Sequence, residues 1–454
     1  MKHPCGFYLK KSLPWVVFVI ALILIHWRYE LNSDEGVVLN AAWDIINGKK
    51  IYVDTFEFMM PGASYLIAAW WKLTAVSYTS ARIISLAIIY SGLIGLYLIS
   101  TSLGIIRWRF LAPALFIIGS AFWQPIHYNA FNVISIIWAL YFLVRAFNQN
   151  KPSSYFISGL FSGLAFIFLQ HKGLALIGSL GSIIAVLVVS GKISGRALLY
   201  FCLGTILPPI ALLTYWSPAV LYENVILFPL QHYQEVNTLP LKLWGGTLAA
   251  ALLLSALVVH STKHETKAAI IALVLTGIFQ MLSSMPRADA THVFQALTPF
   301  LPFCAILFEL CLKQRHDKKL VAFFWMLGVL ALIYNNPPFQ PSAGLVMKAL
   351  QKYCPEPSSL YAGPFMPGLY LESKAQGPTP YSYLIERHNT SEHFADAAQH
   401  LIANPPRCAA LNYVIVEKFG YTKNNPVDQF IEKNYSFAGE IGNIKILVKN
   451  QYAR

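Results

Sequence analysis

The chain has 454 residues, of which 56% are hydrophobic and only 12% are charged. Its mean hydropathy is +0.51, and a soluble protein of this length would carry about twice this share of charged residues. These values exclude an ordinary soluble enzyme and indicate a polytopic membrane protein. The net charge of +13 does not point to a nucleic-acid partner, because the lysines and arginines lie in short connectors between apolar runs rather than on a continuous basic face.

The first apolar run, residues 13–27, follows Lys10 and Lys11. Arg28 comes next instead of a small-residue cleavage site, so we predict a transmembrane helix rather than a signal peptide. The two lysines place the start of this helix in the cytoplasm. Residues 28–79 then form an outer loop, in which the aromatic-rich residues 61–73 are too short to span and are expected to lie in the membrane interface.

The remaining apolar runs predict the rest of the membrane domain. They cover residues 80–103, 110–122, 130–147, 155–169, 173–190, 197–216, 245–260, 268–283, 293–312 and 320–334. With the first run, they predict about eleven transmembrane helices. Lysines and arginines are concentrated in the connectors expected inside, so this register has its N-terminus inside and its C-terminus outside.

The composition changes at the NNPPFQP linker, and residues 336–454 are predicted to be a small α/β domain outside the membrane. Residues 413–416 and 444–448 have strand patterns, and residues 391–403 have the pattern of an amphipathic helix. The chain is therefore divided into an all-α membrane domain, residues 1–335, and this extracytoplasmic domain. Cys354 and Cys408 are either two free thiols or a disulfide, which would require an oxidising compartment.

Acidic residues crowd into the first outer loop, in a chain with only 21 of them: Asp34, Glu35, Asp44, Asp54 and Glu57. A carboxylate beside a bilayer is costly unless it faces water or has a task. Asp34 is the first candidate, because it lies just beyond the outer end of the first helix, where a carboxylate can serve as a general base. The alternative is structural: Asp34 would cap a helix that begins at Glu35.

Three cations are expected on the same side as this loop: Arg82, Lys172 and Arg287. Each could bind a lipid phosphate, and the alternative for each is a side chain that snorkels at a helix end. Four outer histidines, with Asp34 or Asp289, could instead hold a divalent metal: His127, His171, His232 and His292. No paired histidine spacing supports a metal site, and no P-loop or dinucleotide motif supports an ATP-driven pump.

Several motifs resemble the C-type (GT-C) glycosyltransferases, in the branch of the dolichyl-phosphate-mannose protein mannosyltransferases and the aminoarabinose transferases of lipid A. In the first loop these motifs are Asp34-Glu35-Gly36, Gly48-Lys-Lys-Ile-Tyr52-Val-Asp54, Pro61-Gly62, Lys72 and Ala81-Arg82. Later segments are also similar, namely Tyr128-Asn-Ala-Phe-Asn132, Gln170-His-Lys172 and Arg287-Ala-Asp-Ala-Thr-His292 with Pro299. The chain departs from the family at Met60-Pro61, where many members have Pro-Pro, and at Gln170-His171-Lys172, where they have Lys followed by Gln.

The resemblance implies a hexosyl or pentosyl transferase that takes its sugar from a polyprenyl-phosphate donor. It implies that Asp34 is the catalytic base, that Glu35 assists it, and that Arg82, with Lys172 or Arg287, meets the lipid phosphate. We expect further substrate contacts from Tyr52, Asp54, His127, Tyr128, His171, Asp289 and His292. The donor is already activated, so no nucleotide and no metal cofactor are required, and direct displacement would invert the anomeric centre.

The expected partners are the lipid-linked sugar, an acceptor (protein, lipid or glycan) and the membrane, with no nucleic acid. The expected location is the inner membrane of a bacterium, with the active site facing the periplasm. Two other functions remain open. A polytopic transporter should have Gly- or Pro-interrupted helices in matching halves, and no such internal symmetry is visible. A non-catalytic sugar- or lipid-binding membrane protein would tolerate the loss of Asp34.

Overall fold

The computed structural model describes residues 5–26, 28–149, 151–233, 239–262, 266–285, 288–311, 342–355 and 360–452. The chain divides into two compact units, and each is considered by itself. The helical unit comprises Met1–Trp27, Ser85–Tyr215 and Asn237–Asn336. The mixed unit, which contains both helices and strands, comprises Arg28–Ile84, Trp216–Val236 and Pro337–Arg454.

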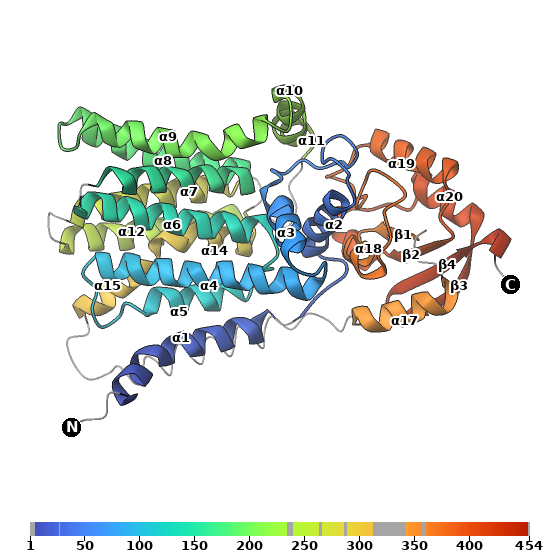
Figure 1. The fold of residues 1–454 in the computed structure, drawn as a ribbon, viewed down its shortest axis with the longest axis horizontal. Coiled ribbons are helices and arrows are strands. Elements are labelled where there is room, and N and C mark those ends of the chain that lie inside the picture. Colours follow the sequence, from blue (N-terminus) through green and yellow to red (C-terminus); the bar gives the residue numbers. More distant parts are fainter. Residues whose placement is uncertain are drawn as a thin grey trace. The chain divides into compact units, whose positions relative to one another are not determined.

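Long apolar helices build the helical unit (Figure 1). They are α1 (Cys5–Ile25), α4 (Tyr78–Ser102), α5 (Leu111–Ser120), α6 (Tyr128–Gln149), α7 (Pro152–Phe168), α8 (Gln170–Val189), α9 (Gly195–Leu213), α12 (Leu241–Ser261), α13 (Lys267–Ser283), α14 (Ala290–Leu297) and α15 (Leu301–Cys311). Within the described residues, six helices are long and apolar enough to cross a membrane. Each predicted apolar run up to residue 312 coincides with a helix, and the last run, residues 320–334, lies outside the described residues.

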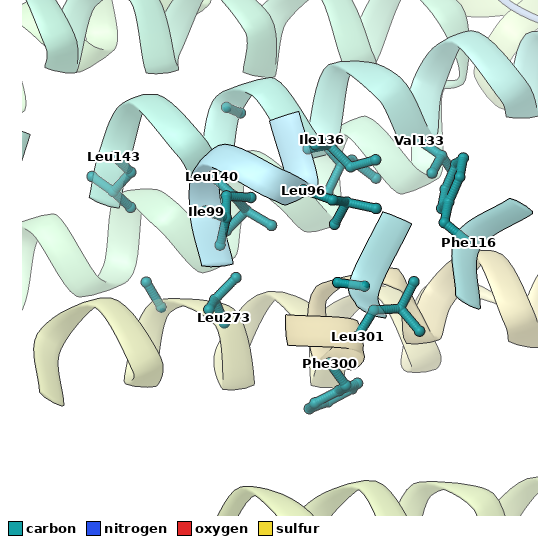
Figure 2. Close-up of a cluster of buried hydrophobic side chains, with 14 of the residues drawn as sticks. Leu96, Ile99, Phe116, Val133, Ile136, Leu140, Leu143, Leu273, Phe300 and Leu301 are labelled. Carbon is teal, nitrogen blue, oxygen red and sulfur yellow. The ribbon is translucent and has the colours of Figure 1, made fainter. Parts of the chain in front are cut away.

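Small residues let neighbouring helices of this unit approach closely. A side chain at Gly159 of α7 would run into the backbone of Phe201 on α9, and one at Gly204 of α9 would run into the backbone of Phe156 on α7. Such backbone approach is a common way for membrane helices to associate, because lipid supplies no hydrophobic drive between them. Figure 2 shows the core beside these helices, where Leu96 and Ile99 of α4 lie near Ile136 and Leu140 of α6.

The mixed unit contains short helices from three parts of the chain. The segment between α1 and α4 gives α2 (Asp34–Ile46) and α3 (Gly62–Leu73), and the segment after α9 gives α10 (Pro218–Tyr222), the π-helix Glu223–Leu227 and α11 (Phe228–His232). The C-terminal part gives α17 (Ala343–Tyr353), α18 (Gly368–Ser373), α19 (Ser391–Ala403) and α20 (Pro426–Asn434). Helix α19 has the bounds that its amphipathic pattern predicted.

A four-stranded mixed sheet organises the C-terminal part, with the strand order β1-β2-β4-β3. Strands β1 (Leu360–Pro364) and β2 (Cys408–Asn412) are parallel, and β4 (Ile444–Lys449) runs antiparallel to both β2 and β3 (Tyr435–Ile441). The strand predicted at residues 444–448 is confirmed.

The strand predicted at residues 413–416 is wrong, because β2 ends at Asn412 and the 3-10 helix Val414–Phe419 follows. The side-chain oxygen of Asn412 accepts a hydrogen bond from the backbone N–H of Val414 at 3.1 Å. Asparagine competes with the sheet ladder in this way and starts a turn, which ends the strand.

Cys354 and Cys408 form a disulfide, with their Cα atoms 6.3 Å apart. Cys354 follows the end of α17, and Cys408 is the first residue of β2, so the bond ties a helix to an inner strand of the sheet. Of the two alternatives left by the sequence, the structure contains the disulfide.

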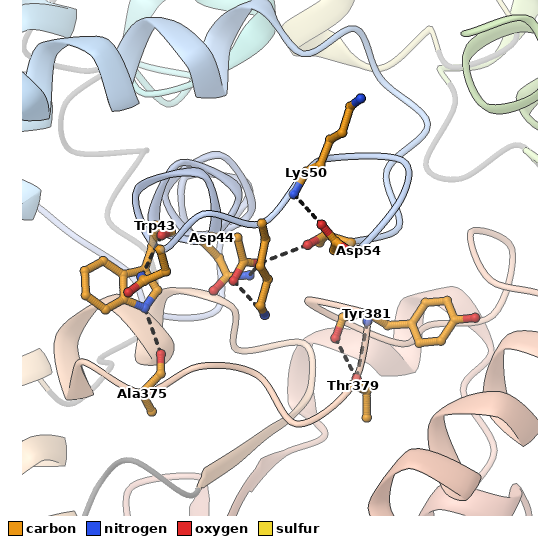
Figure 3. Close-up of polar contacts among 11 residues, drawn as sticks. Trp43, Asp44, Lys50, Asp54, Ala375, Thr379 and Tyr381 are labelled. Atoms are coloured by element: carbon orange, nitrogen blue, oxygen red, sulfur yellow. Dashed lines mark hydrogen bonds and ion pairs between the residues drawn. The ribbon is translucent and has the colours of Figure 1, made fainter. Parts of the chain in front are cut away.

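The segment between α1 and α4 packs directly on the C-terminal part of the mixed unit (Figure 3). The indole N–H of Trp43 donates to the carbonyl oxygen of Ala375 at 2.9 Å. The backbone N–H of Phe56 donates to the carbonyl oxygen of Pro380 at 2.9 Å. The backbone N–H of Gly368 donates to the carbonyl oxygen of Leu31 at 3.0 Å. The loop that carries the candidate acids is therefore one folded body with the small domain.

Candidate functional site

Asp34 is the first residue of α2, and Ser33 is the residue before the helix, with an extended backbone (φ −125°, ψ 164°). The Ser33 hydroxyl donates to the carbonyl oxygen of Glu30 at 2.7 Å. The alternative in which Asp34 caps a helix starting at Glu35 is therefore wrong, since both acids lie in the first turn. The Asp34 side chain is half-buried. The N-terminal end of a helix favours a negative charge, because its first backbone N–H groups lack partners within the helix.

Glu35 is buried and forms an ion pair with Arg82 on α4. The Nη2 atom of Arg82 lies 2.7 Å from Oε2 of Glu35 and also donates to the carbonyl oxygen of Arg28 at 3.0 Å. The guanidinium lies over the ring of Tyr78, 4.6 Å from its centre. Among the described residues, Nε of Arg82 has no hydrogen-bond partner. The charge of Arg82 is thus neutralised by Glu35, and its Nε–H group is a hydrogen-bond donor that remains for a ligand.

Gly36, the third residue of the Asp34-Glu35-Gly36 motif, has a packing role that the sequence does not reveal. A Cβ at this position would lie 2.5 Å from the backbone nitrogen of Gly368 and 3.1 Å from the side chain of Pro367. Only a glycine allows the start of α2 to lie against the start of α18. The position of the two acids therefore depends on contact with the C-terminal part.

Tyr52 and Asp54, both predicted to contact substrate, make hydrogen bonds within their own turn. Tyr52 has a left-handed backbone (φ 68°), and its hydroxyl donates to the carbonyl oxygen of Met59. One carboxylate oxygen of Asp54 accepts the backbone N–H of Lys50 at 2.7 Å, as Figure 3 shows. These bonds shape the turn, and substrate contacts by the two residues remain a prediction.

Asp44, in the last turn of α2, is a buried acid that holds the same turn in place. It is 3% exposed, pairs with Lys49 at 2.9 Å, and accepts a hydrogen bond from the Thr55 hydroxyl at 3.4 Å. Burial raises the pKa of Asp44 above its ordinary value, and the charge and hydrogen bond of Lys49 oppose this rise. Asp44 is thus a structural acid of the loop.

The segment after α9 joins this loop through residues that sequence reasoning missed. Trp216 is buried, and its indole N–H donates to the carbonyl oxygen of Ile51 at 2.9 Å. Further along, the ring of Phe228 stacks on His393 at 5.5 Å, and the ring of Tyr233 stacks on His388 at 5.1 Å. A tryptophan at the end of an apolar run is ordinarily interpreted as an interfacial belt residue, so this anchor has no distinctive signal in the sequence.

In the helical unit, Lys172 lies in the first turn of α8 and is 1% exposed. Its ammonium donates to Oε1 of Gln295 at 2.9 Å, and its backbone carbonyl accepts from Gln280 at 2.9 Å. Among the described residues, the side-chain hydrogen bond of this ammonium is to a neutral amide. A buried cation without an anionic hydrogen-bond partner is costly, so this position suits an anionic ligand.

Asp289, His292 and Asn129 form a second polar group in the helical unit. Oδ1 of Asp289 accepts from the backbone N–H of His292 at 2.9 Å and pairs with Nδ1 of its ring at 2.7 Å. Nε2 of the same ring lies 3.4 Å from Nδ2 of Asn129. The predicted residues Asp289 and His292 are therefore brought together, and Asn129 is a member that sequence reasoning missed.

The remaining predicted site residues are His127, Tyr128, His171 and Arg287. Nδ1 of His127 accepts from the backbone N–H of Asn129 at 3.1 Å, and its ring lies 3.9 Å from that of Tyr128. His171 precedes Lys172 on α8 with an exposed side chain. Arg287 lies outside the described residues. Within the described part of the chain, no group of three His, Cys, Asp or Glu residues could hold a metal ion.

The apolar helices make the chain a multi-pass membrane protein. No protein-family model matches it, and no curated protein matches it. The chain does match solved structures of other proteins. ArnT from Cupriavidus metallidurans bound to undecaprenyl phosphate has a TM-score of 0.66 at 9% identity, over 100% of both chains. The apo state of ArnT from the same organism has a TM-score of 0.64 at 12% identity, over 98% of both chains.

A third match is AglB, the oligosaccharyltransferase of Archaeoglobus fulgidus, in complex with an inhibitory peptide and a dolichol-phosphate. Its TM-score is 0.52 at 11% identity, over 98% of this chain and 75% of that one. ArnT and AglB are GT-C glycosyltransferases. The chain therefore shares the fold of these GT-C glycosyltransferases, and this is the fold that the resemblance of its motifs predicted.

Proposed function

We propose that the chain is an integral-membrane glycosyltransferase that moves a sugar from a polyprenyl-phosphate donor to an acceptor hydroxyl. The fold supports this proposal over the whole chain, since the ArnT structure matches it from end to end. The ArnT structure is bound to undecaprenyl phosphate, and the AglB structure is in complex with a dolichol-phosphate. The observation that carries the proposal is an acid, Asp34, in the first turn of α2 within this fold.

In the proposed reaction, Asp34 takes the proton of the acceptor hydroxyl as the oxygen attacks the anomeric carbon of the sugar. A bond forms between that oxygen and the carbon, while the bond from the carbon to the phosphate oxygen breaks. The polyprenyl phosphate leaves with the bonding electrons, and this single displacement inverts the anomeric centre. Glu35 remains the ion-pair partner of Arg82 during the reaction. This pair holds the first turn of α2 to α4.

The departing phosphate gains negative charge, and we assign Arg82, Lys172 and Arg287 to its stabilisation. Two observations support the first two residues. Nε of Arg82 is a buried donor without a partner among the described residues, and the buried Lys172 ammonium donates to a neutral amide. Arg287 is assigned on the resemblance alone. Substrate contacts by Tyr52, Asp54, His127, Tyr128, His171, Asp289 and His292 are part of the same proposal.

We place the reaction on the extracytoplasmic side of the membrane. The Cys354–Cys408 disulfide supports this side, because such bonds persist in oxidising compartments and are rare in the cytosol. The basic connectors of the sequence give the same orientation. The inner membrane of a bacterium is the location that we propose, and the proposed reaction requires no metal or nucleotide.

The test offers purified full-length protein a panel of polyprenyl-phosphate sugars with hydroxyl acceptors, and measures released polyprenyl phosphate. We expect release with one donor class, and a loss of at least 100-fold in Asp34→Asn, the upper range for loss of a general base being about 10⁴. Glu432→Gln, which changes an exposed acid on α20, is the control and should retain turnover. Full turnover in Asp34→Asn would refute the assignment of the base.

A further inference from the structure

The ring of Tyr78 contacts both the Arg82 guanidinium and the ring of Tyr29. The central carbon of the guanidinium lies 4.6 Å from the centre of the Tyr78 ring. The Tyr29 ring is stacked on that of Tyr78, with 3.8 Å between the ring centres and 24° between the ring planes. All three residues belong to the mixed unit, and Tyr78 and Arg82 lie one turn apart at the start of α4. The proposed transfer reaction gives the two tyrosines no role.

Hydrogen bonds to the backbone hold both tyrosine rings. The Tyr78 hydroxyl donates to the carbonyl oxygen of Arg28 at 3.2 Å, and the same oxygen accepts from Nη2 of Arg82 at 3.0 Å. The Tyr29 hydroxyl donates to the carbonyl oxygen of Gly368, at the start of α18, at 3.3 Å. Burial raises the pKa of Tyr29 well above its ordinary value, so this hydroxyl keeps its proton and the ring stays neutral. The two rings thus form a fixed, uncharged support beside the guanidinium.

The contacts of Arg82 leave its Nε–H group as the buried donor that a ligand can use. Nη2 is occupied by Oε2 of Glu35 at 2.7 Å, and Nε has no hydrogen-bond partner among the described residues. An arginine side chain has several rotatable bonds, so it ordinarily loses rotamer entropy when it binds a ligand. A guanidinium that is already held over an aromatic ring loses less, which favours binding.

We propose that Tyr78, supported by Tyr29, is a positioning residue for the recognition of phosphate by Arg82. This inference rests on the proposed function, in which Arg82 meets the phosphate of the donor lipid. Tyr78 fixes the plane of the guanidinium, so that Glu35 pairs with Nη2 while Nε–H stays available to a phosphate oxygen. Without the ring, the guanidinium can turn until Nε and Nη2 both bind the Glu35 carboxylate, which is the stronger, bidentate arrangement. The donor group for the phosphate is then lost.

The substrates of the proposed reaction should depend on Tyr78 to different extents. The donor lipid presents its phosphate to Arg82 before the transfer, and the polyprenyl phosphate does so after it. The acceptor hydroxyl meets Asp34 instead. Loss of Tyr78 should therefore raise the Michaelis constant for the donor and leave that for the acceptor unchanged. A purely structural role would change both constants.

The test measures binding of undecaprenyl phosphate to the full-length protein in detergent by calorimetry. Tyr78→Leu should bind this lipid about tenfold more weakly, because it loses a partly desolvated cation–π contact. Tyr78→Phe keeps the ring, and Nη2 of Arg82 still bonds the Arg28 carbonyl, so its affinity should stay within about threefold of the wild type. Tyr29→Leu removes only the support of the ring and should give an intermediate loss, which tests the proposal even if Tyr78→Leu folds poorly.

Tyr97→Leu is the matched control. Tyr97 lies on the same helix, and an arginine side chain, that of Arg109, also lies over its ring at 5.2 Å. This variant should bind undecaprenyl phosphate as the wild type does. A second measurement combines Tyr78→Leu with Arg82→Lys, which keeps the charge but not the planar group. Because Tyr78 acts through Arg82, Tyr78→Leu should cause no further loss of affinity in the Arg82→Lys background.

Three results would overturn the positioning role alone: unchanged binding in Tyr78→Leu, equal weakening in Tyr97→Leu, or full additivity of Tyr78→Leu with Arg82→Lys. A joint rise of the Michaelis constants for donor and acceptor in Tyr78→Leu would show a structural role and would overturn it as well. Failure of the wild type to bind undecaprenyl phosphate would overturn the proposed function, and this inference with it.

Discussion

Nη2 of Arg82 lies 2.7 Å from Oε2 of Glu35, and both side chains are almost fully buried, at 9% and 3% exposure. The two residues are 47 positions apart, so the pair connects the first turn of α2 to α4. Asp34 directly precedes Glu35, and its orientation depends on this connection. The ion pair thus links the candidate base to a helix that continues into the apolar part of the chain.

Removing one partner of this pair should destabilise the protein more than removing both. Glu35→Leu leaves a buried guanidinium uncompensated, which costs about 3–5 kcal/mol, whereas an apolar replacement of both residues is often nearly neutral. We therefore expect Glu35→Leu alone to lower the temperature of unfolding and the double variant with Arg82→Leu to recover part of that loss. Thermal unfolding in detergent checks this. Additive effects of the two substitutions would contradict the buried pair.

Gly36→Ala should disturb the site without removing any functional group. The added methyl would meet the backbone of Gly368 at 2.5 Å, and such overpacking costs about 1–3 kcal/mol. Because the clash moves the first turn of α2, turnover should fall together with the unfolding temperature. Gly344→Ala, on α17, is the control, since nothing lies within 4 Å of its added Cβ. The control should be neutral or more stable by up to about 1 kcal/mol. Equal behaviour of the two variants would argue against the contact between α2 and α18.

The Cys354–Cys408 disulfide closes a loop of 54 residues and should contribute about 2–4 kcal/mol to stability. The double variant Cys354→Ser with Cys408→Ser should unfold at a lower temperature and should lose the wild type's sensitivity to reductant. Thiol labelling of protein in intact cells supplies the second measurement. Both cysteines should resist labelling until a reductant is added, because the bond forms on the oxidising side. Immediate labelling of Cys354 or Cys408 themselves, as opposed to the free Cys202 or Cys304, would contradict the outside placement of this part.

Asp44 gives a pH dependence whose sign follows from its environment. Burial raises its pKa in the folded protein above the ordinary value of 3.8, so the folded state binds the proton more readily than the unfolded state does. The contribution of this group to stability therefore falls as pH rises from that ordinary value through the raised one. The difference in unfolding free energy between the wild type and Asp44→Asn should decrease over this interval. A difference that grows with pH would mean that the pair with Lys49 outweighs burial.

The sequence predicted the parts of this protein that depend on local pattern. Apolar runs indicated the helices because each helix meets lipid or core along its own length, and α19 followed from its amphipathic period. The strand predicted at residues 413–416 failed because a single asparagine side chain, that of Asn412, ends β2 early. The links from Trp216 to Ile51 and from Lys172 to Gln295 join distant positions through a tryptophan and an amide in apolar surroundings. Neither residue type gives a distinctive signal in such a segment.

Substitution of Lys172 should separate the effect of this residue on ligand binding from its effect on the stability of the fold. A buried ammonium whose hydrogen-bond partner is a neutral amide does not help the folded state, so Lys172→Met should leave the unfolding temperature unchanged or raise it. The same substitution removes the charge assigned to the lipid phosphate, so undecaprenyl phosphate should bind at least tenfold more weakly, a loss of about 1.4 kcal/mol. Lys192→Met, at an exposed position after α8, is the control and should change neither quantity. A variant that is more stable but binds the lipid more weakly is the result expected when a residue is retained for its ligand rather than for the fold. If Lys172→Met instead unfolds at a lower temperature and still binds the lipid, the ammonium has a structural role, and the phosphate assignment falls.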